Sequence, residues 1–313
     1  MANNQASAST IDWLLAGDPA IRWQVRRDLL DSSPTAVERE QRRVATEGWG
    51  ARLLALQDAE GTWAGRMYNP KWISTTYTML LLRDLGLPTA NCQARTACQL
   101  LLDRGLEHDG GIGFGWGQSE TCVTGIVLSI LSWFRFDDAR LDTIADHLLE
   151  QQMDDGGWNC HYPFGATHGS MNTTILALEG LLHYEHHRAR AAKKLRAVRA
   201  AQRRGREFLL AHRLFRSHRT GKIIKNDFVR MTFPPQWHFD FLRGLDYFRA
   251  AGAAKDERLT DAIERLERKR RHDGRWTLEH RYPARYWFQM ETIRRQSRWN
   301  TLRALRVLKW WES

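Results

Sequence analysis

A short element recurs along this 313-residue chain and constrains the fold more than any other feature. Each copy follows a helix-like stretch and consists of a glycine-containing turn that ends in a bulky apolar residue. A polar loop comes next, and then a second helical stretch that is far more apolar. The copies cover residues 57–63, 109–114, 151–158 and 273–276. Repetition of this kind predicts helix pairs that stack on one another to bury a continuous core.

Helical stretches of two kinds alternate along the sequence. The apolar kind covers residues 20–30, 72–85, 121–134, 172–184, 237–248 and 299–311. The charged or amphipathic kind covers residues 11–16, 37–56, 92–102, 141–152, 192–212 and 257–270. A helix that is apolar on most faces is buried on both sides, whereas a charged amphipathic helix lies at the surface. Six such pairs predict an all-α fold, an (α/α)6 toroid in which an outer ring encloses an inner ring. An open solenoid is the alternative, and its two layers would show similar amphipathicity.

The chain is expected to form one toroid domain over residues 10–313 after a flexible N-terminus at residues 1–9, because no segment reads as a linker. The first ten residues lack the basic start and apolar run of a secretory signal. No stretch approaches the roughly 18 apolar residues of a membrane span. The four cysteines form no dense framework, so we expect reduced thiols and a cytoplasmic location, with peripheral attachment to a membrane as an alternative.

The formal charge of +11 is concentrated in a basic helical stretch at residues 188–206. Three interpretations stay open: a solvated outer helix, a contact with an anionic membrane surface or partner, and a nucleic-acid contact. Nucleic acid is the least favoured of the three, because neither a recognition motif nor interleaved aromatic residues accompany the basic residues.

The repeated elements at residues 57–63 and 151–158 carry a Gln, a turn with an acidic residue before glycine, and a Trp. They resemble the Gln-Trp repeats of squalene and oxidosqualene cyclases and related repeats in protein prenyltransferases. This resemblance implies the terpenoid-cyclase toroid and a hydrophobic, isoprenoid-type ligand in its central cavity. Squalene-hopene cyclases are about twice as long, however, and use an Asp-x-Asp-Asp acid that this sequence lacks. The Asp-Asp-x-x-Asp pattern of ionising terpene synthases is also missing, so an ordinary triterpene cyclisation is not expected.

The starts of the apolar helices are the expected place for chemistry, because the loops before them meet at one mouth of a toroid. Polar residues at these positions give four catalytic candidates: Glu120, Cys122, His168 and His238. The first three resemble the Asp-x-Cys and later His that bind zinc in protein prenyltransferases. A carboxylate, a thiolate and an imidazole can form a tetrahedral Zn²⁺ site with one open position. Without metal, Glu120 and the two histidines could act as acid and base.

Structural roles compete with each of these assignments. Asn172, and not His168, could be the residue that aligns most naturally with the prenyltransferase histidine, and asparagine is a poor zinc ligand. Cys122 can be a small apolar filler, and Glu120 can stabilise a helix N-terminus. Arg298 could bind a phosphate or satisfy loop carbonyls. The candidate substrate-binding residues are Trp72, Trp116, Asn172, Trp237, Tyr286, Arg298 and Asn300, whereas Trp63, Trp158 and Trp276 are expected to pack within the repeat.

Three functions are consistent with these features. The first is an enzyme that acts on a hydrophobic, isoprenoid-type substrate inside the barrel. The second is a zinc-dependent transferase or cyclase directed at a thiol. The third is a non-catalytic toroid that binds a lipid or a peptide. A long loop at residues 213–233 is expected to cover one mouth in each case.

Overall fold

The computed structural model describes residues 7–115, 117–188 and 192–313. Within these ranges the regular secondary structure is helical, and β-structure is limited to isolated bridges. The predicted all-α class is confirmed. The α-helices are α1 (Ala8–Leu15), α2 (Pro19–Asp28), α3 (Pro34–Arg42), α4 (Gly48–Leu54), α5 (Thr75–Leu85), α6 (Cys92–Gly105), α7 (Thr121–Trp133), α8 (Arg140–Glu150), α9 (Met171–Arg188), α10 (Ala192–Ala211), α11 (Phe241–Ala250), α12 (Thr260–Arg268) and α13 (Arg298–Glu312). Short 3₁₀ turns lie at η1 (Arg43–Ala45), η2 (Tyr162–Phe164), η3 (Asn226–Val229) and η4 (Glu257–Leu259).

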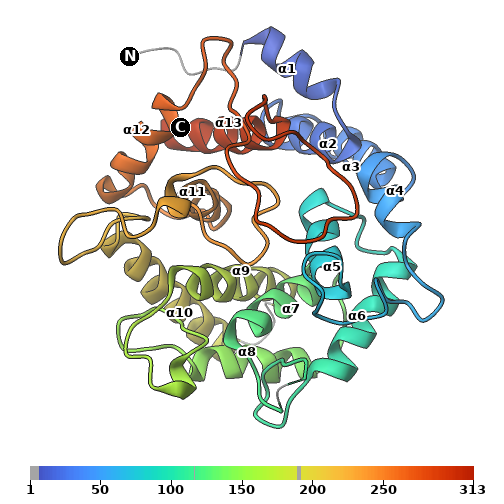
Figure 1. Cartoon of the computed structure of the whole chain (residues 1–313), viewed down its shortest axis with the longest axis vertical. Coiled ribbons are helices and arrows are strands. Elements are labelled where there is room, and N and C mark those ends of the chain that lie inside the picture. Colours follow the sequence, from blue (N-terminus) through green and yellow to red (C-terminus); the bar gives the residue numbers. More distant parts are fainter. Residues whose placement is uncertain (1–6, 116, 189–191) are drawn as a thin grey trace.

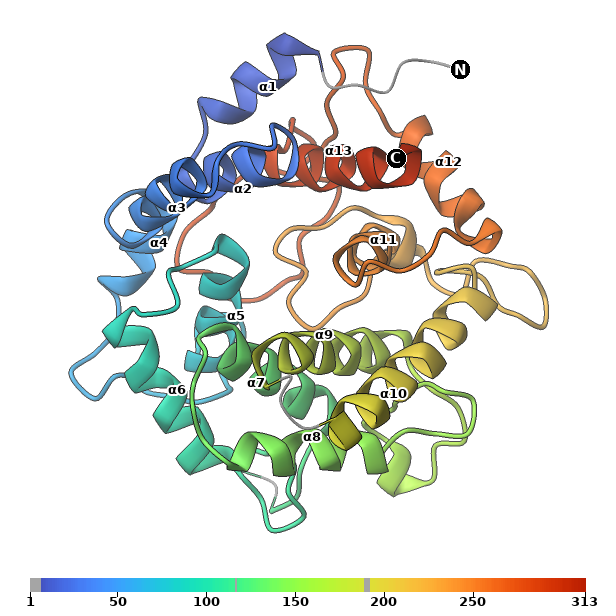
Figure 2. The same cartoon turned by 180° about the vertical axis from the view of Figure 1, so that it is seen from behind.

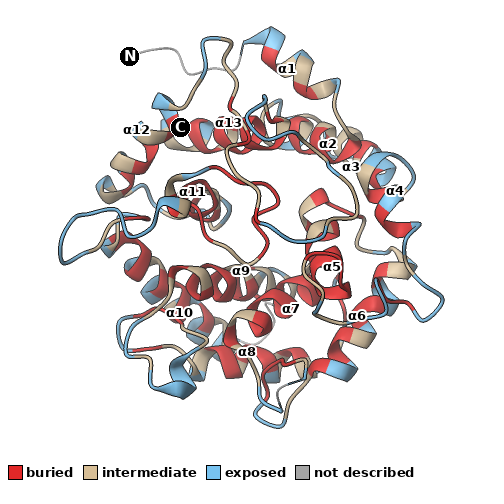
Figure 3. Ribbon diagram, in the orientation of Figure 1, coloured by how far each residue is buried: buried red, intermediate tan, exposed pale blue. Residues whose placement is uncertain are grey.

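The helices form two concentric layers (Figures 1 and 2). The inner ring consists of α2, α5, α7, α9, α11 and α13, and the outer ring of α1, α3 with α4, α6, α8, α10 and α12. The inner helices are buried along most of their length, and exposed residues lie on the outer helices and loops (Figure 3). This is the alternation that the sequence predicts, because only the apolar helices are covered on two sides.

The ring closes between its first and last inner helices. Helix α13 packs against α2, and Arg306 Nη1 lies 3.1 Å from Asp28 Oδ2 across this junction. At the start of α13, Arg298 Nε donates to the carbonyl oxygen of Trp13 in α1 at 3.0 Å. Contacts between residues nearly 280 positions apart exclude the open solenoid.

The repeated element joins each outer helix to the next inner helix through its tryptophan. The indole N–H groups of Trp63, Trp158 and Trp276 donate to the carbonyl ten residues earlier, at 2.7, 2.7 and 2.8 Å. These carbonyls belong to the last turns of α4, α8 and α12, where a helix leaves its acceptors unpaired. The backbone N–H of each tryptophan donates to a threonine of the following inner helix, at 2.9–3.0 Å. The prediction that these three tryptophans pack within the repeat is confirmed.

Helices α7 and α9 approach each other closely, and two glycines make this possible. A Cβ atom on Gly125 would lie 2.6 Å from the carbonyl oxygen of Leu176, and one on Gly180 would lie 2.7 Å from that of Gly125. Backbone atoms at these distances leave no room for a side chain. The starts of α7 and α9 are therefore held side by side.

Several helix boundaries differ from the prediction. The differences at α5 and α11 affect the end of the barrel where the inner helices begin. Gly48 adopts a φ of 64°, which interrupts the helix expected over residues 37–56. Asp240 accepts a hydrogen bond from the Arg243 N–H at 2.8 Å and so begins α11 later than expected. Helix α5 begins at Thr75, so Trp72 lies in the loop before it. Trp237 and His238 likewise lie in the loop before α11, which begins at Phe241. Among the described residues, none of the helices combines the length and apolar composition needed to cross a lipid bilayer.

Candidate functional site

A cavity of about 650 Å³ occupies the barrel on the side where the inner helices end. Its walls come from the second halves of α2, α5, α7, α9 and α11 and from the first half of α13. Phe233 and Trp299 stack with ring centroids 4.0 Å apart and close the cavity toward the helix N-termini. We call the open end the C-terminal mouth and the opposite end the N-terminal mouth.

Positive charge predominates on the cavity wall. Seven arginines face four carboxylates there, which leaves an excess of three positive charges before the three histidines are considered. The arginines are Arg27, Arg83, Arg135, Arg243, Arg249, Arg303 and Arg306, and the carboxylates are Asp28, Asp84, Glu179 and Asp246. Low-dielectric walls strengthen the field of such a group, so the cavity attracts anions.

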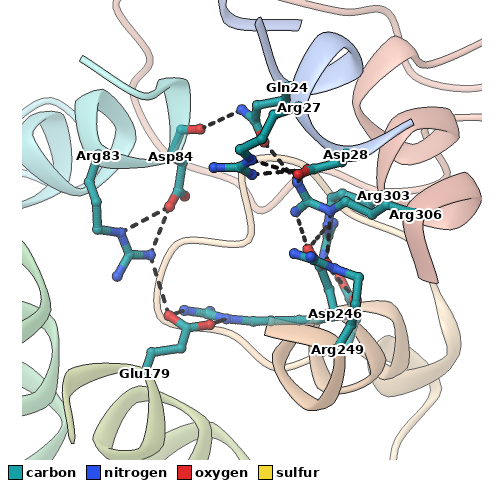
Figure 4. A network of polar contacts seen from close by, with 12 residues as sticks. Gln24, Arg27, Asp28, Arg83, Asp84, Glu179, Asp246, Arg249, Arg303 and Arg306 are labelled. Carbon is teal, nitrogen blue, oxygen red and sulfur yellow. Dashed lines mark hydrogen bonds and ion pairs between the residues drawn. The ribbon is translucent and has the colours of Figure 1, made fainter. Parts of the chain in front are cut away.

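Glu179 lies at the centre of one half of this charged network (Figure 4). Its two carboxylate oxygens accept from Arg243 Nε and Nη2 at 2.7 and 2.8 Å, and Arg83 Nη2 donates to it at 3.3 Å. The Glu179 side chain is 16% exposed and both arginines are below 10%. Although burial opposes ionisation, the two guanidinium groups lower the pKa of Glu179 to about 2.

Asp246 organises the other half of the network. Arg249 Nε donates to it at 2.8 Å, Arg303 Nε lies 3.8 Å away, and Arg306 also forms an ion pair with it. Arg306, Arg249 and Arg303 outweigh burial and hold the pKa of Asp246 well below its usual range. Arg27 pairs with Asp28 in the same region, where the pKa of Asp28 is also lowered. The carboxylates of both halves are therefore ionised at neutral pH.

The remaining wall is aromatic and holds polar groups without partners. Trp23, Trp133, Phe233, Tyr247 and Trp299 supply the rings. The indole N–H of Trp299 and the hydroxyl of Ser132 have no hydrogen-bond partner among the described residues. A buried donor without an acceptor costs on the order of 1–3 kcal/mol, so both groups are unfavourable where they stand in the wall.

His183 lies beside this aromatic wall. Its ring meets that of Trp133 edge to face, with centroids 5.9 Å apart. Burial, reinforced by Arg83, lowers the pKa of His183 to about 3, and the imidazole is neutral at neutral pH. It can accept or donate a hydrogen bond to a ligand without adding charge.

The four residues predicted to be catalytic lie outside this cavity. Glu120 and Cys122 are at the start of α7, at the N-terminal mouth, where burial raises the pKa of Glu120 despite Lys71 and His161 nearby. The structure places Cys160 beside Cys122: the Cys122 N–H donates to Cys160 Sγ at 3.1 Å. Rings gather at this mouth, with Trp72 against Tyr77 at 4.8 Å and Tyr68 against Tyr77 at 5.2 Å between centroids.

His238 also belongs to the N-terminal mouth. Its ring is stacked between Trp237 and Tyr282, with centroids 3.7 and 3.3 Å away, and Trp72 meets it from the side. Burial, with help from Lys225 and Arg243, lowers the pKa of His238 to about 3. A neutral imidazole between two rings is a packing element, and it could serve as a base only after one of them moves.

His168 is exposed and lies apart from Glu120 and Cys122, on a second cavity of about 930 Å³. This cavity separates the beginning of α9 and the end of α10 from residues 217–224 of the long loop. This part of the loop covers the second cavity, whereas Phe233 at the end of the loop lines the barrel cavity. In the described part of the chain, His, Cys, Asp and Glu side chains nowhere gather in threes in a way that could hold a metal ion. The zinc hypothesis finds no ligand set there.

The other predicted binding residues have partners within the protein. Asn172 accepts from the Phe239 N–H at 2.8 Å, and Asn300 donates to the carbonyls of Met231 and Thr277 at 3.3 and 3.0 Å. Tyr286 donates to the Tyr282 carbonyl at 2.6 Å. Arg298 Nε donates to the carbonyl of Trp13, which lies in the last turn of α1 and not in a loop as expected. Trp116 lies outside the described residues.

The charged cavity was not predicted from the sequence, because the candidate residues came from the starts of the apolar helices. A signal for it does exist in the sequence: Arg83, Glu179, Arg243, Arg303 and Arg306 interrupt helical stretches that are otherwise apolar. Charged residues in a helix that must be buried on both sides have to pair or face a cavity.

Comparisons with known proteins concern the fold alone. No protein-family model matches the chain, and no curated protein matches it significantly. Among solved structures, the type II terpene cyclase MstE from Scytonema is 18% identical over 93% of this chain and 88% of its own, with a TM-score of 0.47. A protein from Actinoplanes is 18% identical over 95% and 91%, with a TM-score of 0.46. An MstE variant in complex with geranylgeranyl dihydroxybenzoate is 14% identical over 86% and 94%, with a TM-score of 0.34. Similarities of this size carry no information on ligand or reaction.

Proposed function

We propose that the barrel binds an amphipathic ligand, an isoprenoid-type chain that carries a phosphate, diphosphate or carboxylate group. The observation that supports this most directly is the excess of arginines over carboxylates within one 650 Å³ cavity that also has aromatic walls. Its volume falls within the range of about 300–1,000 Å³ that is usual for small-molecule sites. A bare hydrocarbon fits poorly, because it would cover the charged arginines and carboxylates of the wall.

Arg27 and Arg249 are the side chains best placed to receive the anionic group. Arg27 uses Nε and Nη2 for Asp28, and Arg249 uses Nε for Asp246, so each guanidinium keeps further N–H donors for a ligand. Both line the cavity, and their side chains are 41% and 21% exposed. Guanidinium groups bind phosphate and carboxylate through paired hydrogen bonds. The apolar chain would then extend toward Phe233 and Trp299.

Isothermal titration with geranylgeranyl diphosphate, geranylgeraniol and inorganic diphosphate tests this proposal. We expect the diphosphate ester to bind at least about tenfold more tightly than either part alone, because it uses both kinds of wall. Arg249→Gln should weaken its binding about tenfold, and Arg268→Gln, on the outer helix α12, should leave it unchanged. Equal affinity for the ester and the alcohol would refute the role of the arginines.

Acid catalysis at the N-terminal mouth is a second candidate function, favoured by Glu120. This carboxyl is partly buried and burial raises its pKa. Burial also raises the pKa of the nearby Tyr68 and Tyr77, with a smaller contribution from Glu120. A protonated carboxyl can protonate an alkene, and aromatic faces stabilise the cation that results. The carboxylates of the barrel cavity are poor donors by comparison, since their arginine partners keep them ionised.

Product analysis separates the two candidates. Geranylgeranyl diphosphate is incubated with the protein and the extract is examined by gas chromatography and mass spectrometry. If Glu120 is the acid, a cyclised product forms with the unaltered protein and disappears with Glu120→Gln, while ligand binding persists. Recovery of unreacted ligand from the unaltered protein would leave binding alone as the function.

A further inference from the structure

Two thiols from neighbouring inner-helix starts meet at the N-terminal mouth. Cys122 lies in the first turn of α7 and Cys160 in the loop that leads to α9. The backbone N–H of Cys122 donates to Cys160 Sγ at 3.1 Å. Thr173 Oγ1 donates to the same sulfur at 3.4 Å. The Cys160 sulfur thus accepts from two donors, one on each of the two neighbouring helices.

The pairing distinguishes these cysteines from the other two. Cys98 is fully buried within α6, and Cys92 is exposed at the first residue of that helix. Cys122 and Cys160 are intermediate in exposure and lie in contact with each other through the Cys160 sulfur. Two cysteines held in contact can form a disulfide without unfolding of the chain.

The surrounding structure keeps the two thiols together. Gly125 and Gly180 allow the backbones of α7 and α9 to touch one turn away from Cys122, and the Trp158–Thr174 hydrogen bond anchors the loop that carries Cys160. A disulfide would therefore join segments that are already adjacent.

We propose that Cys122 and Cys160 form a redox-active dithiol, which low-molecular-weight disulfides such as oxidised glutathione convert to an intramolecular disulfide. The Cys160 sulfur attacks one sulfur of the oxidant, which releases one thiol and leaves a mixed disulfide. The Cys122 sulfur then displaces the second thiol and forms the Cys122–Cys160 bond. The protein loses two electrons and two protons, and the oxidant becomes two thiols. This site depends neither on the ligand proposed for the barrel nor on a metal.

Thiol trapping and peptide mapping test the proposal on the full chain. The protein is equilibrated with reduced and oxidised glutathione at several ratios, quenched with N-ethylmaleimide, digested without reductant and analysed by mass spectrometry. We expect a cross-linked peptide pair that contains Cys122 and Cys160, together with the loss of two alkylated thiols in one step. Dithiothreitol should restore both.

Two variants provide the controls. Cys92→Ser should form the same cross-link at the same glutathione ratio. Cys160→Ser should abolish it, and circular dichroism should show that this conservative variant keeps its helices. Glutathione attached to either cysteine without a cross-link, or a cross-link through Cys92 or Cys98, would overturn the proposal.

Discussion

The carboxylate of Glu179 accepts two hydrogen bonds from the guanidinium of Arg243, at 2.7 and 2.8 Å. This pair joins α9 to α11 across the barrel cavity, and Arg83 extends it to α5. Three of the six inner helices are thus connected through one carboxylate. The same contacts that hold these helices together give the cavity its charge.

Removal of the Glu179 charge should destabilise the protein strongly. We expect Glu179→Gln to lower the free energy of unfolding by about 3 kcal/mol, because the buried Arg243 then lacks its anion, while Arg83 keeps Asp84. Urea denaturation followed by circular dichroism measures the change. Glu38→Gln removes the partner of Arg42 in an exposed pair and should change the free energy by less than about 0.5 kcal/mol. Similar effects of the two substitutions would contradict the importance given to burial.

The buried His183 should make the free energy of unfolding depend on pH. The pKa of His183 is about 3 in the folded protein and near the ordinary value of 6.5 in the unfolded chain. Between these values the unfolded state binds a proton that the native state does not, so stability is complete above pH 6.5 and falls as the pH is lowered toward 3. Each such group contributes a slope of up to about 1.4 kcal/mol per pH unit.

Urea denaturation at pH 7, 6 and 5 measures this slope. His183→Leu should reduce it, and the remaining slope should still contain the contribution of His238, whose pKa is also about 3. Equal slopes for the variant and the unaltered protein would show that His183 is accessible to protons in the folded state.

The stability of the repeated element should depend on the threonine hydroxyl as well as on the tryptophan. Thr174 Oγ1 accepts the backbone N–H of Trp158 at 2.9 Å in a fully buried position. Thr174→Val keeps the shape and leaves this N–H unpaired, which should cost about 1–3 kcal/mol in thermal or urea denaturation. Thr174→Ser retains the acceptor and should lose much less. A valine variant as stable as the serine variant would contradict the hydrogen-bond argument.

The fold could be predicted from the sequence because its signals are local. Apolar and charged helices alternate through six pairs, and a glycine-containing turn recurs before Trp63, Trp158 and Trp276. The site could be predicted only in part. Residues such as Cys122 and His168 start neighbouring helical units, but the distance between them depends on how the intervening loop folds, and the loop brings Cys160 to Cys122 instead.

The charged cavity depends on contacts of still longer range. Glu179 and Arg243 are 64 residues apart, and Arg306 and Asp28 are 278 residues apart. Sequence alone shows that such residues interrupt apolar helices, which identifies them as unusual. Which carboxylate pairs with which arginine follows only from the closure of the ring.

The close approach of α7 and α9 should make Gly125 irreplaceable even by alanine. In an open helix this substitution would stabilise the protein by up to about 1 kcal/mol, since alanine has the higher helix propensity. Here the new Cβ would lie 2.6 Å from the Leu176 carbonyl oxygen, which belongs to a backbone that cannot rotate away. We expect Gly125→Ala to lower the free energy of unfolding by about 2–3 kcal/mol in urea denaturation.

Gly252→Ala is the matched comparison, because Gly252 has open space around it and a φ of 57°. This substitution should lower the free energy of unfolding only by the backbone cost of about 1 kcal/mol. The sign of the Gly125→Ala effect distinguishes the two possibilities. A gain in stability would mean that α7 and α9 can move apart, and that the barrel wall beside the cavity deforms more easily than these contacts indicate.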